Sequence, residues 1–267
     1  MKKFTKISLI ASGVLAVVGI AFLISGFVMG VSWQEVEDTF EFHTAARWFE
    51  EHGDITEGSE TSHSFSAGEI KKLEIEFNKG DLYLSETDGD EIRVSTFNRK
   101  DKVNQENGTL KIESRGRVSN DNTIEIEIPR GMSFDEVELK IDAGSGQVDN
   151  LKTKELEAEV NAGDLTLYED IAAAKVKLDV NAGSLDTELL DAKEVEIKCD
   201  AGSVSTTLSG KQNDYQIEMK GDLASVSLDG FEYSGLSTKK QWGDSNASRK
   251  LEAKCNAGSL DIEFELD

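Results

Sequence analysis

Proline and histidine are scarce in this sequence, and each scarcity argues against a class of protein. Pro129 is the only proline among 267 residues, whereas glycine occurs 23 times. Together with the frequent alternation of apolar residues with Glu and Lys, this composition favours an all-β repeat over a helical protein. The three histidines, His43, His52 and His63, are spaced 9 and 11 residues apart, outside any stretch expected to be rigid. We therefore expect neither a histidine-based catalytic triad nor a metal site.

Basic residues are also in short supply. The chain has 29 Lys and Arg against 52 Asp and Glu, which gives a formal charge of -23. Binding to nucleic acid requires concentrated Lys and Arg, so nucleic acid is not an expected partner. The sequence also lacks a nucleophile elbow and a phosphate-binding glycine loop ahead of a helix. We expect no catalysis and no cofactor.

One long apolar run, residues 7–33, contains no charged side chain. It is long enough to cross a hydrocarbon core of about 30 Å. Lysines precede the run and acidic residues follow it, which predicts a cytoplasmic N-terminus. A cleaved signal peptide is the alternative, although its apolar segment is usually only about 7–15 residues long. We expect residues 1–33 to be a single-pass anchor in the cell membrane, with the remainder extracytoplasmic.

The composition changes twice after this anchor. Residues 34–69 are acidic with scattered aromatic residues, and we interpret them as a stalk. Residues 70–130 alternate apolar and polar side chains at irregular spacing, which predicts strands that cap a larger β domain. Pro129 and Gly131 then mark a break before a regular repeat that fills residues 131–267.

The repeat consists of alternating apolar residues followed by Asp or Asn, Ala and Gly. Its glycines at 144, 163, 183, 202 and, in a degenerate copy, 221 are 19, 20, 19 and 19 residues apart. The Asx side chain can bond to the nearby backbone and Gly can adopt positive φ, so each copy predicts a corner. Calcium bound by the corner carboxylates is a weaker alternative, because the Gly-Gly-x-Gly-x-Asp pattern is absent. The predicted structural corners are Asp142, Gly144, Asn161, Gly163, Asn181, Gly183, Asp200, Gly202, Asn256 and Gly258.

Each repeat has the two-residue period of a strand, with Val160, Val180 and Cys199 in one inward-facing column. Coils of about 19 residues stacked about 4.8 Å apart form a β-solenoid, a single-stranded β-helix-like stack. An antiparallel sandwich of hairpins remains the alternative. In the solenoid register Cys199 and Cys255 share the inner column but lie at least two coil steps apart, about 10 Å. A disulfide needs Cα atoms within about 7 Å, so we expect two free, buried thiols.

The segment between Gly221 and Gly258 is 37 residues long and does not follow the repeat. This length fits two coils or one coil with an insertion. Residues 237–250 contain only Trp242 as a large apolar residue, so we expect an excursion loop over residues 229–250 instead of a hidden coil. Loops that interrupt a repeat often lie on its binding face. An equal alternative is that the aromatic residues of this loop only cover the flank of the solenoid. The candidate partner-binding residues are Phe231, Tyr233, Lys239, Lys240 and Trp242.

Several of these features together resemble a known family. Ile128-Pro129-Arg130-Gly131, the serial Asx-Ala-Gly corners and the final segment Cys255–Ile262 are similar to the candidate-adhesin, β-strand-repeat domains of unknown function on Gram-positive envelopes. The resemblance covers residues 70–266. It implies a β-solenoid exposed outside the membrane and linked to adhesion or envelope stress, and it transfers no catalytic residues.

The expected function is therefore noncatalytic binding or sensing at the bacterial envelope. The expected partner is a cell-wall polymer or an envelope protein. A carbohydrate-active β-helix enzyme and a purely structural surface spacer are the two alternatives. A groove with converging carboxylates and aromatic residues would favour the enzyme, and a flank without a groove would favour the spacer.

Overall fold

The computed structural model describes residues 60–98, 100–114, 122–222, 224–229, 231–234, 238–243 and 246–265. The predicted membrane anchor, most of the predicted stalk, His43 and His52 lie outside the described residues. Within the described ranges, no helix is long and apolar enough to cross a membrane. The anchor therefore stays a prediction.

The described residues are almost entirely in strands, with two short 3-10 turns at Ala67–Glu69 and Gln212–Asp214. The strands are β1 (Thr61–Ser66), β2 (Lys72–Phe77), β3 (Asp81–Thr87), β4 (Glu91–Thr96), β5 (Lys102–Glu106), β6 (Thr109–Glu113), β7 (Thr123–Pro129), β8 (Ser133–Ile141), β9 (Ser145–Val160), β10 (Asp164–Val180), β11 (Ser184–Cys199), β12 (Ser203–Leu208), β13 (Tyr215–Gly221), β14 (Ser225–Leu228), β15 (Phe231–Ser234), β16 (Thr238–Trp242), β17 (Arg249–Cys255) and β18 (Ser259–Phe264).

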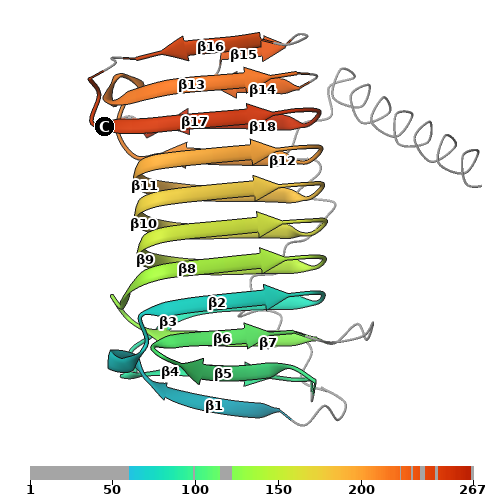
Figure 1. Cartoon of the computed structure of the whole chain (residues 1–267), viewed down its shortest axis with the longest axis vertical. Coiled ribbons are helices and arrows are strands. Elements are labelled where there is room, and N and C mark those ends of the chain that lie inside the picture. The colour runs from blue at the N-terminus through green and yellow to red at the C-terminus, as the bar shows by residue number, and fades with distance from the viewer. Residues whose placement is uncertain are drawn as a thin grey trace, which may run out of the picture. The chain divides into compact units, whose positions relative to one another are not determined.

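The regular repeats form a stack of parallel coils (Figure 1). β9, β10 and β11 pair in parallel, residue for residue, with a register shift near the middle of each strand. Asn150 and Glu169 lie at this shift with φ of 49° and 54°, and they give each coil a second corner. The all-β, solenoid-like prediction is confirmed. The sandwich of antiparallel hairpins is excluded for these repeats, since their neighbours run parallel.

Each coil consequently has two strand segments, one after the Asx-Ala-Gly corner and one before it. Apolar residues of both segments point inward, where they form continuous columns along the stack. Val160, Val180, Cys199 and Cys255 are each at most 1% exposed, as expected for the inner column. Removing such side chains from water is the main favourable contribution to folding, at about 25 cal/mol per Å² of apolar surface.

The corner glycines are required for a reason that differs from the prediction. Gly144 has a φ of 133°, but Gly163, Gly183 and Gly202 do not have positive φ. Instead, the carbonyl group of the preceding coil occupies the space that a side chain would need. A Cβ at Gly183 would lie 1.9 Å from the carbonyl oxygen of Gly163. Close backbone approach between coils therefore selects glycine at these corners.

The Asx side chains bond from coil to coil. The amide of Asn161 donates to Asp142 Oδ1 at 2.8 Å, and the amide of Asn181 donates to Asn161 Oδ1 at 2.5 Å. The amide of Asn256 donates to Asp200 Oδ1, also at 2.5 Å. In each bond an Asn amide nitrogen donates to an Asp or Asn side-chain oxygen of the neighbouring coil. The bonds follow the edge of the stack and form an Asx ladder.

The spatial order of the coils differs from their order in the sequence (Figure 1). The C-terminal coil, β17–β18, lies between β11–β12 and β13–β14, because β17 pairs in parallel with both β11 and β13. At the other end β2–β3 lies between β6–β7 and β8–β9. The outer coils are β6–β7 at one end and β13–β14 at the other. In the sequence, each lies closer to the middle of the chain than the coil that it covers.

This order corrects the predicted separation of the two cysteines. Cys199 and Cys255 are direct register partners on β11 and β17, one coil step apart instead of at least two. The prediction was wrong because it assumed that coils stack in the order of the sequence. Both thiols are free and buried.

Antiparallel strands cover both ends of the stack. β1 pairs with β4 and β4 with β7 at one end, and β16 pairs with β13 and β15 with β14 at the other. In the segment 229–250, predicted as an excursion loop, the described residues form β15, β16 and the first residues of β17. These strands shield the backbone of the last coils from pairing with other chains.

Candidate functional site

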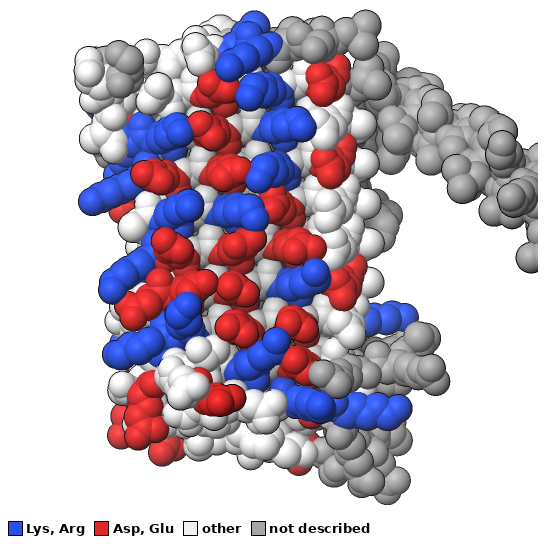
Figure 2. All heavy atoms as spheres, viewed as in Figure 1, with Lys and Arg blue, Asp and Glu red and all other residues white. Residues whose placement is uncertain are grey.

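The two faces of the solenoid carry different charge patterns. One, here called the paired face, is formed by β2, β6, β8, β13, β17 and the second segments of β9, β10 and β11. Lys and Glu interleave on it (Figure 2). Ion pairs join neighbouring coils, as between Lys140 and Glu159 at 3.2 Å, and neighbouring positions of one strand, as between Lys198 and Glu196 at 2.6 Å. Most carboxylates of this face therefore have a cationic neighbour.

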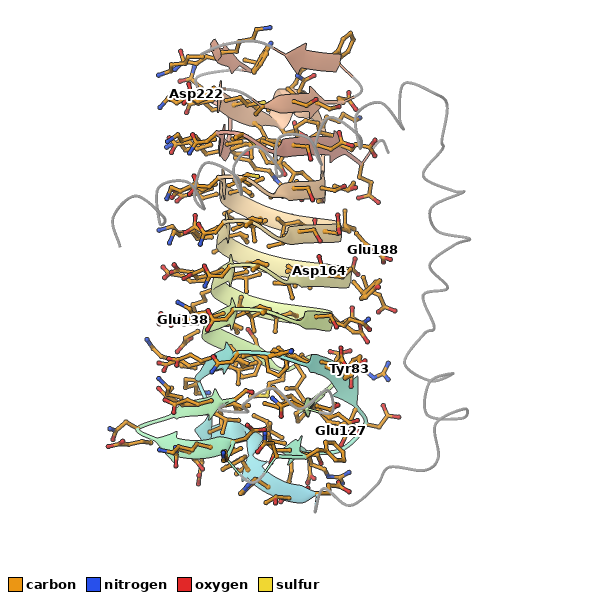
Figure 3. The ribbon with its side chains drawn as sticks, turned by 90° about the vertical axis from the view of Figure 1, so that its right-hand side faces the viewer. Tyr83, Glu127, Glu138, Asp164, Glu188 and Asp222 are labelled. Atoms are coloured by element: carbon orange, nitrogen blue, oxygen red, sulfur yellow. The ribbon has the colours of Figure 1, made fainter. Side chains whose placement is uncertain are left out.

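The opposite face, here called the acidic face, is formed by β3, β7, β12, β14, β18 and the first segments of β9, β10 and β11. These strand segments contain no Lys or Arg. In Figure 3, Tyr83, Glu127 and Glu188 project on the side opposite to Glu138 of the paired face. Burial, together with nearby carboxylates, raises the pKa of Asp149 and of Asp186. Carboxylates of the acidic face therefore repel one another, and Arg93 of β4 lies 3.5 Å from Glu127 at the edge of this face.

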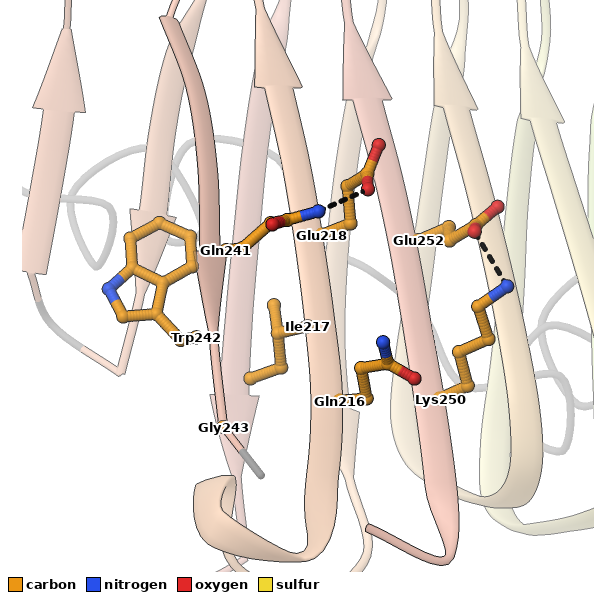
Figure 4. Close-up of a pocket in the computed structure, with 8 residues that line it drawn as sticks. All are labelled: Gln216, Ile217, Glu218, Gln241, Trp242, Gly243, Lys250 and Glu252. Atoms are coloured by element: carbon orange, nitrogen blue, oxygen red, sulfur yellow. Dashed lines mark hydrogen bonds and ion pairs between the residues drawn. The ribbon is translucent and has the colours of Figure 1, made fainter. Parts of the chain in front are cut away.

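A pocket of about 320 Å³ opens near the C-terminal end of the paired face (Figure 4). It lies among β13, β16 and β17, where two parallel coil strands meet the antiparallel capping strand. Polar side chains from all three strands line it, and the indole of Trp242 lies on the far side of β16 from Glu218 and Glu252 (Figure 4). The lining residues are Gln216, Ile217, Glu218, Gln241, Trp242, Gly243, Lys250 and Glu252.

The backbone pairing of β16 with β13 builds one wall of this pocket. Trp242 is the register partner of Ile217, and Gln241 is the partner of Glu218. Gly243 follows with a φ of 83°, and a Cβ there would lie 1.9 Å from the carbonyl oxygen of Tyr215. Only glycine permits the chain to leave β16 so close to β13. The indole of Trp242 is partly buried and packs against the core.

Glu218 is the electrostatic centre of the pocket. Its carboxylate is 2.9 Å from Lys239 Nζ, 3.0 Å from Lys220 Nζ, and accepts a 2.8 Å hydrogen bond from Gln241 Nε2. These donors, Lys239 first, lower the pKa of Glu218 to about 2. Glu218 is therefore a carboxylate at neutral pH, and it fixes the orientation of the Gln241 amide.

The second coil strand at the pocket is β17, which contributes Lys250 and Glu252. The ammonium group of Lys250 is 2.6 Å from the carboxylate of Glu252, and this hydrogen bond raises the pKa of Lys250. Glu252 is the register partner of Glu218, and Lys250 is the partner of Gln216. The floor thus alternates acidic, basic and amide groups on two adjacent strands.

The structure brings together three of the five predicted partner-binding residues. Trp242 lines the pocket, Lys239 pairs with Glu218 at its edge, and Lys240 Nζ lies 5.7 Å from the centre of the Trp242 ring. Phe231 is 67% exposed on β15 and is not among the lining residues. Tyr233 pairs through its backbone with Val226, and its side chain is outside the described atoms.

The coil residues of the pocket were missed by the sequence analysis. Gln216, Glu218, Lys250 and Glu252 occupy ordinary outward positions of two repeat strands, and nothing in their pattern distinguishes them from other outward residues. They line one pocket with Trp242 because β16 pairs antiparallel with β13. The degenerate repeat copy that ends at Gly221 is the one signal in the sequence that points to this place. Polar residues on that strand include Gln216 and Glu218, which are two of the four.

No group of three or more His, Cys, Asp and Glu side chains that could hold a metal occurs in the part of the chain that the structure describes. Among the histidines, His63 lies in β1 and stacks with Phe65 at a ring-centre distance of 6.3 Å.

Solved structures with similar folds come from several bacteria. A candidate cell adhesion protein from Clostridium sporogenes is 17% identical, with 78% of this chain and 100% of that chain covered and a TM-score of 0.43. A candidate adhesin from Bacteroides fragilis is 12% identical, with 78% and 98% covered and a TM-score of 0.36. One from Parabacteroides distasonis is 13% identical, with 78% and 95% covered and a TM-score of 0.37.

Comparison with curated proteins gave no match. One family, described as Toastrack DUF4097, matches residues 70–266, which include all the coils and the capping strands except β1. This match agrees with the family resemblance drawn from the Asx-Ala-Gly corners. The chain belongs to the Toastrack DUF4097 family.

Proposed function

We propose that this chain is a noncatalytic binding module of the bacterial envelope, and that the pocket beside Trp242 holds its ligand. The observation that supports this is the composition of the pocket. The pocket is lined by the Trp242 side chain together with two amides, two carboxylates and a lysine, from Gln216, Gln241, Glu218, Glu252 and Lys250. Pockets that combine an aromatic surface with a few oriented polar groups are typical ligand sites.

The chemistry of this pocket fits a sugar-containing polymer. An indole can stack on the apolar face of a sugar ring, while amide and carboxylate groups bond its hydroxyl groups. Lys239, Lys240 and Lys250 add positive charge at this end of a strongly acidic chain. An anionic cell-wall polymer would therefore meet less repulsion here than on the acidic face.

A carbohydrate-active enzyme is the second function with a specific observation behind it, because Glu218 and Glu252 face each other on adjacent strands. Glycoside hydrolysis by two carboxyl groups needs one whose pKa is raised, so that it can donate a proton. The pKa of Glu218 is instead lowered to about 2 by Lys239, Gln241 and Lys220. Glu218 is thus suited to hold a ligand through hydrogen bonds, and binding is the better-supported function.

The test is attachment to isolated cell-wall fragments, measured by co-sedimentation of the purified chain. We expect the triple variant Lys239→Ala, Lys240→Ala and Trp242→Ala to bind roughly tenfold more weakly or worse, as for the loss of a binding hot spot. Phe231→Ala is the matched control, since Phe231 is an exposed aromatic residue that does not line the pocket. It should bind as the parent does.

Thermal melting of the same variants separates binding from folding. A well-folded triple variant that binds like the parent would remove this pocket from consideration. A large loss of stability would instead assign Trp242 to the packing of the β16 cap. The spacer alternative predicts that neither the parent nor any variant binds.

The location is proposed from residues 1–33 alone, which lie outside the described residues. If these residues anchor the chain with its N-terminus in the cytoplasm, external protease should digest the β domain on intact protoplasts. A short membrane-bound fragment should remain. Complete protection of the β domain would overturn the proposed orientation.

A further inference from the structure

Cys199 and Cys255 are the only cysteines of the chain, and the fold places them side by side. They occupy equivalent positions on the parallel strands β11 and β17, each directly before an Asx-Ala-Gly corner. Both side chains are buried in the same inner column. The pairing joins residues 56 positions apart in the sequence, because the C-terminal coil inserts beside β11.

Their geometry is compatible with a covalent bond. Register partners on adjacent parallel strands have Cα atoms about 4.8 Å apart, which lies inside the range of about 4.4–6.8 Å found for disulfides. In the folded chain, the proximity of the two thiols lowers the pKa of Cys199 and raises that of Cys255.

We propose that Cys199 and Cys255 form a disulfide that fastens the C-terminal coil to the stack. The oxidant is a small or protein disulfide, R–S–S–R. The Cys199 thiolate attacks one of its sulfur atoms and releases the first R–S⁻. The Cys255 thiolate then attacks the Cys199 sulfur of this mixed disulfide and releases the second R–S⁻. The two cysteine protons pass to the released thiolates, so two cysteines are oxidised and one disulfide is reduced to two thiols.

The position of the bond gives it a structural role. β17 lies between β11 and β13, although β12 to β16 separate it from β11 in the sequence. A bond between Cys199 and Cys255 would close this whole excursion into a loop, which restricts the unfolded chain and opposes detachment of the last coil. Since both thiols are buried in the finished coil, oxidation takes place while this end is still open, during folding or local opening.

Formation of the bond in cells rests on the proposed extracytoplasmic location, because thiols stay reduced in the cytoplasm. The chemistry itself is tested in vitro. The full-length chain is unfolded in detergent and guanidinium chloride, then refolded in a buffer of reduced and oxidised glutathione. Denaturing alkylation and intact-mass measurement count the remaining thiols, and peptide mapping identifies any crosslink.

We expect no alkylated cysteine, a crosslinked peptide pair containing Cys199 and Cys255, and a melting temperature higher without reductant than with it by about 5 °C or more. The variant Cys255→Ser should show no effect of reductant. Two alkylated cysteines after oxidative refolding would overturn the proposal and leave both residues as apolar fillers. A crosslink that lowers the melting temperature would equally contradict a stabilising role.

The double variant Cys199→Ser and Cys255→Ser separates this proposal from the binding function. Neither cysteine lines the pocket, so the folded double variant should bind cell-wall fragments as the parent does. Failure of the disulfide therefore leaves the binding result unchanged, and failure of binding leaves the thiol count unchanged.

Discussion

The guanidinium group of Arg249 lies over the ring of Tyr215, 5.6 Å from its centre. Both side chains bond to the same acceptor, because Arg249 Nη1 and Tyr215 Oη donate to the carbonyl oxygen of Ser209 at 2.9 and 2.7 Å. Arg249 Nη2 also pairs with Asp191 at 2.9 Å. The first residue of the inserted coil is thereby joined to β11, to β13 and to the turn between β12 and β13.

Arg249→Ala is expected to destabilise the domain by roughly 1–3 kcal/mol, because it removes these hydrogen bonds from a partly buried carbonyl and hydroxyl group. Urea unfolding measures the loss. Lys250→Ala is the control, since Lys250 is the neighbouring residue and makes an exposed ion pair with Glu252 that contributes about 0–1 kcal/mol. Equal losses in the two variants would show that the Arg249 contacts do not hold the coil.

Gly183→Ala tests the close approach of coils at the corners. The added Cβ would lie 1.9 Å from the carbonyl oxygen of Gly163 and 2.8 Å from Val160 Cγ1. Neighbouring coils must then separate, and we expect a loss of about 1–3 kcal/mol or more. Gly68→Ala is the control, because a Cβ at Gly68 meets nothing within 4 Å. Similar melting temperatures for both variants would be incompatible with the backbone contact between Gly183 and Gly163.

Val180→Asp tests the inner column. Val180 is 1% exposed and pairs with Val160 on one side and Cys199 on the other. A carboxyl group there has no partner, so we expect a loss of several kcal/mol or failure to fold. Lys198→Asp places the same group on the outward side of the adjacent strand and should cost much less. Equal melting temperatures for the two variants would show that Val180 does not face the core.

The acidic face predicts an unusual dependence of stability on pH. Burial, followed by nearby carboxylates, raises the pKa of Glu125, Asp149 and Asp186 in the folded protein. These acids bind protons more tightly when the protein is folded, so their stabilisation is complete below the unfolded pKa of 3.8 or 4.5. It is lost as the pH rises through the higher folded pKa.

Glu218 changes the stability with pH in the opposite direction. Its pKa falls from 4.5 to about 2 on folding, so its stabilisation is present above 4.5 and is lost as the pH falls toward 2. At low salt the melting temperature should therefore rise as the pH falls from 7 toward 4.5 and fall again as the pH approaches 2. At pH 7, added NaCl should raise the melting temperature by screening the carboxylates. A melting temperature that only falls on acidification would contradict mutual repulsion on the acidic face.

Part of the candidate site could be predicted from the sequence. Trp242, Lys239 and Lys240 stand out because they interrupt the repeat, and they do gather near one pocket. Gln216 and Glu252 did not stand out, because outward positions on repeat strands all have similar polar side chains. Which of them line the pocket is decided by the antiparallel pairing of β16 with β13.

The sequence by itself determined the coil. Apolar alternation with period two is a local property of a strand, and the spacing of the Asx-Ala-Gly corners sets the length of each turn of the stack. Only the tertiary structure decided which coils are neighbours. Every coil presents a similar apolar column and a similar row of backbone groups to the next, so the local pattern is equally satisfied by several stacking orders. The connections and the capping strands select one of these, in which Cys255 lies beside Cys199.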